Sequence, residues 1–131
     1  MTAYDRPLSP HLQIWKWGLH MALSIAHRAT GIANAAGALL LVLWLHAAAS
    51  GPETYARFVD LLLTPLGRLV LFGITLSLCM HLATGIRHLV MDSGRALEKT
   101  ANRRLGYFAV FLGVFLAVAI WVAAYWHAGL I

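Results

Sequence analysis

The sequence predicts an all-α membrane protein with three transmembrane helices. Hydrophobic residues make up 60% of the 131 positions and charged residues only 11%, whereas soluble domains carry about 25% charge. The apolar residues fall in three segments, and each exceeds the ~20 residues that a helix needs to cross the ~30 Å hydrocarbon core of a bilayer. The connections are too short to hold a soluble domain, so we expect residues 1–131 to form a single transmembrane domain.

The three helices are expected at about residues 21–49, 61–91 and 105–131. They follow an N-terminal segment, residues 1–20, which we expect in the cytoplasm or at the membrane interface. Because all three segments exceed the minimum span, we expect the helices to tilt in the bilayer.

Lysine and arginine are distributed unevenly between the two ends of the predicted helices. By the positive-inside rule, the richer end is cytoplasmic, which places the N-terminus in the cytoplasm and the C-terminus in the periplasm. The first residues resemble neither a signal peptide nor a transit peptide, so we expect a multi-pass protein of the bacterial inner (cytoplasmic) membrane. The richer end holds Arg6, Lys16, Arg28, Arg87, Arg95, Lys99, Arg103 and Arg104, and the other end holds Arg57 and Arg68.

The net charge of +5 does not indicate a nucleic-acid partner, because the basic residues flank apolar segments and form no basic stretch with interleaved aromatic residues. A single cysteine, Cys79, excludes an internal disulfide and any multi-cysteine iron–sulfur site within this chain. Membrane lipid is therefore the expected surrounding of most of the surface.

Small residues recur on single helix faces of the first and third segments, which permits close approach of neighbouring helices. Three helices make a thin bundle, so these faces predict a larger bundle completed by helices of another chain. The faces comprise Gly31, Ala35 and Ala38 on the first segment and Gly106, Gly113, Ala117 and Ala124 on the third.

A first polar cluster lies near the start of the first helix, where Ser24, His27, Arg28 and Gly31 share one face. A hydroxyl, an imidazole and a guanidinium together offer several hydrogen-bond donors and one fixed positive charge. They suit an anionic or carbonyl ligand, such as a cofactor carboxylate or a quinone oxygen. The alternative is interfacial, with Arg28 extending to lipid phosphates and His27 at the membrane boundary.

A second polar cluster lies near the end of the second helix, where His81, Gly85, His88 and Asp92 share one face. Imidazole is costly in hydrocarbon and usually functional there, and neutral imidazole is a good axial ligand for haem iron. His81 is the deeper histidine and the better candidate ligand, with a histidine bonded to a neighbouring helix as the alternative. The glycine one turn away suggests a gap for a flat ring. Asp92 is expected to pair with Arg87 or Arg95, with proton entry as the alternative.

The predicted topology brings the two clusters to the same leaflet. The first helix enters the membrane from the cytoplasm near Met21, and the second returns there near His88. Ser24, His27 and Arg28 should therefore lie at the depth of His81, although they are more than fifty residues away in sequence.

Three motifs resemble the cytochrome b subunits of succinate dehydrogenase, respiratory complex II. They match that family in order and spacing from Arg6 to Gly94, and the third helix adds little beyond its position. The motifs are RPLSPHL at 6–12, SIAHRATG at 24–31, and His81 followed by GIRHLVMDSG at 85–94.

The resemblance implies roles for individual residues. His81 matches the axial ligand of haem b, whose second axial histidine belongs to a companion anchor subunit. His27 and Arg28 match residues near the haem propionates, and Ser24 and Arg28 match the hydroxyl and guanidinium of the ubiquinone site. The remaining matches are apolar residues that line the quinone pocket: Trp17, Met21 and Ile25.

The resemblance also implies a place in a complex. A flavoprotein subunit with FAD oxidises succinate, and an iron–sulfur subunit carries the electrons to the membrane, where this chain and a second anchor subunit bind ubiquinone and haem b. The chain itself has no flavin fingerprint or cysteine cluster. The alternatives are the anchor of a related fumarate reductase, a stand-alone cytochrome b, a small transporter component and an assembly subunit without cofactors. The apolar stretch from Leu39 to Leu45 disfavours the transporter.

Overall fold

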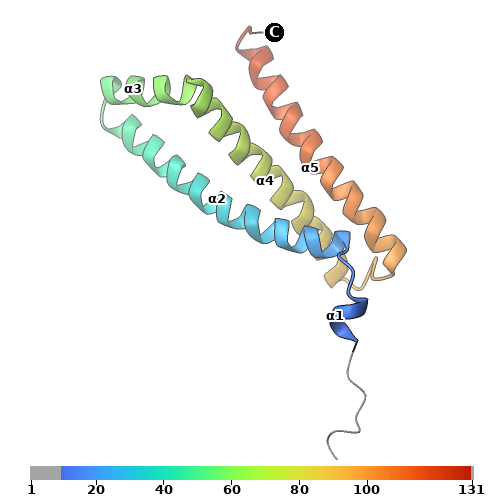
Figure 1. The fold of residues 1–131 in the computed structure, drawn as a ribbon. Coiled ribbons are helices and arrows are strands. Elements are labelled where there is room, and N and C mark those ends of the chain that lie inside the picture. Colours follow the sequence, from blue (N-terminus) through green and yellow to red (C-terminus); the bar gives the residue numbers. More distant parts are fainter. Residues whose placement is uncertain (1–9, 131) are drawn as a thin grey trace, which may run out of the picture.

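The computed structural model describes residues 10–130 and is helical, without a strand in that range (Figure 1). Three of its helices are long and apolar enough to cross a membrane. The predicted all-α fold with three membrane spans is therefore confirmed. In chain order the helices are α1 (His11–Ile14), α2 (Leu19–Ala49), α3 (Pro52–Leu63), α4 (Pro65–Asp92) and α5 (Lys99–His127).

Helix α4 is the central element, because it packs against both α2 and α5. Figure 1 shows α2 and α4 running in opposite directions with α3 across one end, and α5 returning along the other side of α4. The start of α2, the end of α4 and the start of α5 therefore lie at the same end of the molecule. The N-terminal motif residues from Arg6 to Ser9 fall outside the described residues.

The first connection holds a helix that the sequence analysis did not separate from the second span. Residues 61–63 end α3, and the spanning helix begins at Pro65 rather than at residue 61. The break occurs at Thr64, whose extended backbone ends one helix and whose Oγ1 accepts a hydrogen bond from the Gly67 N–H at 3.1 Å. Proline at the first helical position fits such a start, because it has no N–H to satisfy.

The other boundaries also differ from the expected ones. Helix α5 starts at Lys99, six residues before the expected position, and ends at His127. The third span was expected to begin at about residue 105, but the charged residues at 99–104 are compatible with a helix that extends beyond the bilayer.

Small residues of α5 lie at its contacts with two helices. Gly106, Gly113 and Ala117 of the predicted face are buried. A Cβ added at Gly113 would lie 3.0 Å from the Met80 Cα of α4, and one at Gly106 would lie 2.9 Å from the Leu23 Cδ1 of α2. The last residue of that face, Ala124, is exposed. The small residues of this face therefore permit close packing at Gly106, Gly113 and Ala117, but not at Ala124.

Candidate functional site

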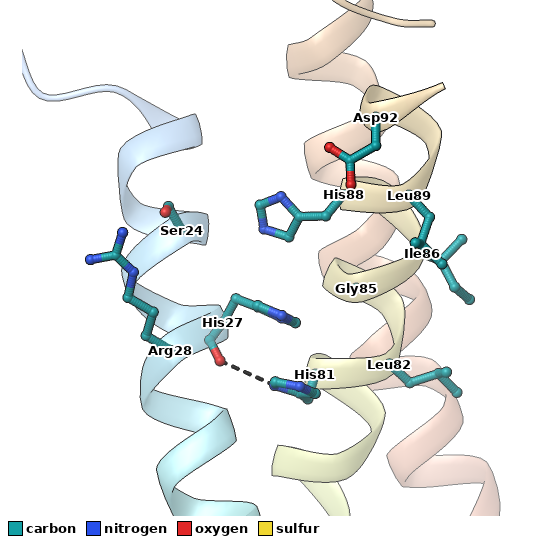
Figure 2. Close-up of a pocket in the computed structure, with 10 residues that line it drawn as sticks. All are labelled: Ser24, His27, Arg28, His81, Leu82, Gly85, Ile86, His88, Leu89 and Asp92. Carbon is teal, nitrogen blue, oxygen red and sulfur yellow. Dashed lines mark hydrogen bonds between the residues drawn. The ribbon is translucent and has the colours of Figure 1, made fainter. Parts of the chain in front are cut away.

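The two predicted polar clusters meet in a cavity of about 690 Å³ between α2 and α4. Its size lies within the usual range of small-molecule sites. Figure 2 shows His27 of α2 pointing toward His81 and His88 of α4. The lining residues are Ser24, His27, Arg28, His81, Leu82, Gly85, Ile86, His88, Leu89 and Asp92.

His27 and His81 lie in direct contact at the base of this site. Their rings stack with centroids 3.9 Å apart and planes 11° from parallel. The His27 Nδ1 lies 2.8 Å from the Thr84 Oγ1. The His81 Nδ1 lies 3.1 Å from the His27 carbonyl oxygen and 3.2 Å from the Thr30 Oγ1. The two helices are thus joined by a reciprocal set of contacts, in which each histidine bonds the threonine of the other helix.

This reciprocity reflects a short sequence repeat that the sequence analysis missed. His27 to Gly31 reads HRATG, and His81 to Gly85 reads HLATG. Each histidine ring lies over the glycine of the facing helix. A Cβ at Gly31 would lie 3.3 Å from the His81 Cε1, and one at Gly85 would lie 3.5 Å from the His27 Cε1. The expected gap for a flat ring at Gly85 is therefore occupied by the His27 imidazole.

Ser24 and Arg28 lie one turn apart on α2. Figure 2 shows the Arg28 side chain extending away from α4, whereas His27 points toward it. In the part of the chain that the structure describes, neither Ser24 nor Arg28 forms a side-chain hydrogen bond. Their donors are therefore available to a ligand. Both residues line the same cavity as His81.

Three residues predicted near the quinone do not line this cavity. Trp17 is 59% exposed and packs edge-on against Trp15, with ring centroids 5.7 Å apart. Ile25 is 53% exposed on the same helix as Ser24, and Met21 is half-buried. Ile25 and Trp17 therefore offer apolar surface outside the cavity.

The predicted pairing of Asp92 with Arg87 or Arg95 is wrong, because neither ion pair forms among the described residues. Arg87 is only 2% exposed, and its Nη2 donates to the Asn102 Oδ1 on α5. Asp92 is exposed and lines the cavity beside His88. The His88 ring is half-buried and lies 5.0 Å from the His27 ring, so it belongs to the site rather than to the lipid boundary alone.

The site is suited to a group that needs one imidazole ligand. Haem iron has equatorial nitrogen ligands of its own and takes histidine as an axial ligand. His81 has one ring nitrogen bonded to α2, as the alternative of a histidine bonded to a neighbouring helix predicts. The same contact leaves its other ring nitrogen available to a metal. The arginine and serine beside it offer donors to carboxylate or carbonyl oxygens.

Three apolar spans with a histidine-lined cavity near one end are features of a membrane-embedded helical protein. The chain belongs to the succinate dehydrogenase/fumarate reductase transmembrane subunit family, whose family model matches residues 2–129. The family resemblance that the three motifs carry is confirmed. It makes the chain a membrane-anchor subunit of an oxidoreductase of the succinate dehydrogenase type.

The relatives come from mitochondria and bacteria. The succinate dehydrogenase cytochrome b560 subunit, mitochondrial, of Bos taurus is 38% identical over 121 residues, which cover 91% of this chain and 72% of the relative. The cytochrome b556 subunit of Paracoccus denitrificans is 38% identical over 114 residues, covering 87% and 88%. That of Rickettsia prowazekii is 33% identical over 117 residues, covering 89% and 91%.

Proposed function

We propose that this chain is the cytochrome b membrane anchor of a succinate:ubiquinone oxidoreductase, where it helps to bind haem b and ubiquinone. The observation that carries this proposal is the cavity between α2 and α4, whose lining includes His81, Ser24 and Arg28. The relatives named as succinate dehydrogenase cytochrome b subunits support it.

On the haem side, His81 is the proposed axial ligand of the iron. His27 does not serve as the second ligand, because its ring is stacked on that of His81 at 3.9 Å and leaves no room for a porphyrin between them. The second axial histidine is therefore assigned to a second small anchor subunit, whose helices would complete the bundle. His27 and Arg28 are proposed to lie near the haem propionates.

On the quinone side, Ser24 and Arg28 are the proposed polar contacts. Reduction of a quinone takes two electrons and two protons, and negative charge develops on its oxygens. The Ser24 hydroxyl can donate to a carbonyl oxygen. The Arg28 guanidinium can stabilise the developing charge, an effect that is large where water is excluded. Trp17, Met21 and Ile25 are proposed as an apolar border of this site.

The proposed partners supply the remaining chemistry. A flavoprotein subunit with FAD oxidises succinate, and an iron–sulfur subunit carries the electrons to the cytoplasmic face of the bacterial inner membrane. This chain anchors both subunits through its three spans. The cavity lies at the end of the molecule that holds the start of α2, where the predicted orientation puts the cytoplasm.

The quinone role is tested with Arg28→Ala in the purified complex. We expect quinone reduction to fall by about 100-fold, the order of losing one charge-stabilising group, while succinate oxidation by a soluble dye is retained. Arg57→Ala is the matched control, because Arg57 is exposed at the other end of the molecule and pairs only with Glu53. Equal loss of both activities in Arg28→Ala would contradict the proposal.

The haem role is tested with His81→Ala. We expect the reduced b-type absorption band to be lost or shifted, whereas His127→Ala, at the opposite end of the spans, leaves it intact. An unchanged spectrum and haem content in His81→Ala would remove this residue as a ligand. The haem content of the wild-type complex also separates this reading from a stand-alone cytochrome b with two haems.

The family description includes fumarate reductases, so the anchor of a fumarate reductase is the second candidate. The relatives at 33–38% identity are named as succinate dehydrogenases, which favours succinate oxidation. The ratio of succinate oxidation to fumarate reduction in the purified complex separates the two.

A further inference from the structure

The contacts between the HRATG and HLATG repeats pack α2 on α4 and also engage the Nδ1 atom of each histidine ring. We propose that Thr30 and Thr84 are positioning residues that hold His81 and His27, respectively, in the tautomer with the proton on Nδ1 and a free lone pair on Nε2. The tautomer is inferred from the hydrogen-bond partners of each ring. Its importance for the metal rests on the function proposed above.

For His81, the backbone decides the direction of the bond. Its Nδ1 lies 3.1 Å from the His27 carbonyl oxygen, which can only accept, so Nδ1 must carry the proton. The Thr30 hydroxyl donates its own proton to the same carbonyl at 2.9 Å. Its oxygen is then an acceptor for the Nδ1–H at 3.2 Å. Thr30 and the carbonyl therefore share the imidazole proton and hold the ring against Gly31.

For His27, the threonine decides the direction. The Thr84 hydroxyl donates to the Met80 carbonyl oxygen at 2.7 Å, with the His81 carbonyl at 3.3 Å as a second acceptor. Its one proton is thus committed to the backbone, and its oxygen accepts from the His27 Nδ1 at 2.8 Å. Thr84 is buried, with 1% of its surface exposed, so water does not compete for this bond.

The two halves of this arrangement have similar sequences and each pairs a histidine with a threonine of the other helix, yet their roles differ. The Nε2 of His81 is the atom that an iron would bind through its lone pair. The hydrogen bonds of the His81 Nδ1 raise the basicity of that Nε2 and fix the orientation of the ring. The Nε2 of His27 is an acceptor as well. Of the two residues proposed near the propionates, Arg28 is therefore the one that donates to them.

The tautomer of His27 is measured by ¹⁵N NMR on the reduced complex with histidine-labelled chain, and His27→Gln assigns its signals. We expect a protonated Nδ1 and an unprotonated Nε2 in the wild type. In Thr84→Val the loss of the acceptor should move the His27 signals toward a mixture of tautomers, and Thr84→Ser should restore them. A proton on Nε2 in the wild type, or no change in Thr84→Val, would overturn the assignment without reference to haem.

The effect on the metal is measured by the rate at which haem passes from the complex to an excess of apomyoglobin. We expect Thr30→Val to lose haem about 10-fold faster, the lower end of the effect of removing a partner of a ligand histidine, because the carbonyl bond remains. Thr30→Ser should behave as the wild type. The matched control is Thr75→Val, which removes a hydroxyl elsewhere on α4, where it bonds Leu71 and Trp121.

The outcomes separate the two proposals. Loss at the wild-type rate in Thr30→Val, or equally fast loss in Thr30→Ser, would overturn the role of the Thr30 hydroxyl. If His81→Ala retains its haem, the proposed ligand is wrong, and the NMR result for His27 and Thr84 still decides the tautomer.

Discussion

The closest backbone approach between α4 and α5 makes Gly113 a sensitive position. A Cβ at this residue would lie 2.6 Å from the Met80 Sδ, 3.0 Å from the Met80 Cα and 3.3 Å from the Cys79 carbonyl oxygen. The sulfur can rotate away, but the Cα and the carbonyl oxygen move only with the helix. Gly113→Ala therefore forces α4 and α5 apart by a few tenths of an ångström.

Two opposing effects determine the size of this change. Overpacking in a close contact costs about 1–3 kcal/mol, and the backbone contacts place this case in the upper half of that range. Alanine is better than glycine in a helix by about 0.8–1.0 kcal/mol. The net destabilisation is therefore about 1–2 kcal/mol, and it should lower the temperature at which this subunit leaves the complex.

The measurement is the temperature at which half of this subunit has dissociated from the detergent-solubilised complex. Gly106→Ala is the matched control, because its Cβ would meet only the ends of the Leu23 and Leu19 side chains, at 2.9 and 3.2 Å. Those ends can rotate, so the helix-propensity gain should offset the contact. Equal midpoints for the two variants, or a higher midpoint for Gly113→Ala, would refute the reasoning.

Two further substitutions test polar contacts of α4. Asn102→Leu leaves the buried Arg87 guanidinium without its acceptor on α5. We expect this change to cost about 1.5–3 kcal/mol in the same dissociation assay, and the double variant with Arg87→Met to recover part of the loss. An unchanged midpoint in Asn102→Leu would contradict this prediction. Thr64→Ala removes the hydroxyl that caps the Gly67 N–H. The loss of about 1 kcal/mol of helix stability should raise the rate of hydrogen exchange at that amide about fivefold. Thr64→Ser should keep the wild-type exchange rate.

The three spans were predictable because length and composition alone limit what can cross a bilayer. The break between α3 and α4 was not predicted, since the apolar residues 61–63 run without a charge into those of α4. The signal was present in Thr64 and Pro65, an N-cap residue followed by proline at the first helical position. Hydrophobicity obscured it because both helices are apolar at this point.

The contents of the site were predictable in part. Spacing on each helix and the order of the spans predicted that Ser24, Arg28 and His81 would share one depth. The direct stacking of His27 on His81 was not predictable from one helix at a time, because it depends on the axial register of α2 against α4. The HxATG repeat encodes that register, since each glycine accommodates the facing ring.

The polar side chains in the spans fall into two groups: those with hydrogen-bond partners inside the chain and those without. This difference separates structural from functional residues better than their depth in the membrane does. An unpaired polar group in hydrocarbon costs several kcal/mol. The buried Ser77 meets that cost within the chain, because its Oγ donates to the Asn34 Oδ1 at 2.8 Å and lies 3.0 Å from the Thr30 carbonyl. Ser24 and Arg28 have no such partner among the described residues and line the cavity. The fold does not use their donors, so their hydrogen bonds must go to water, to headgroups or to a ligand.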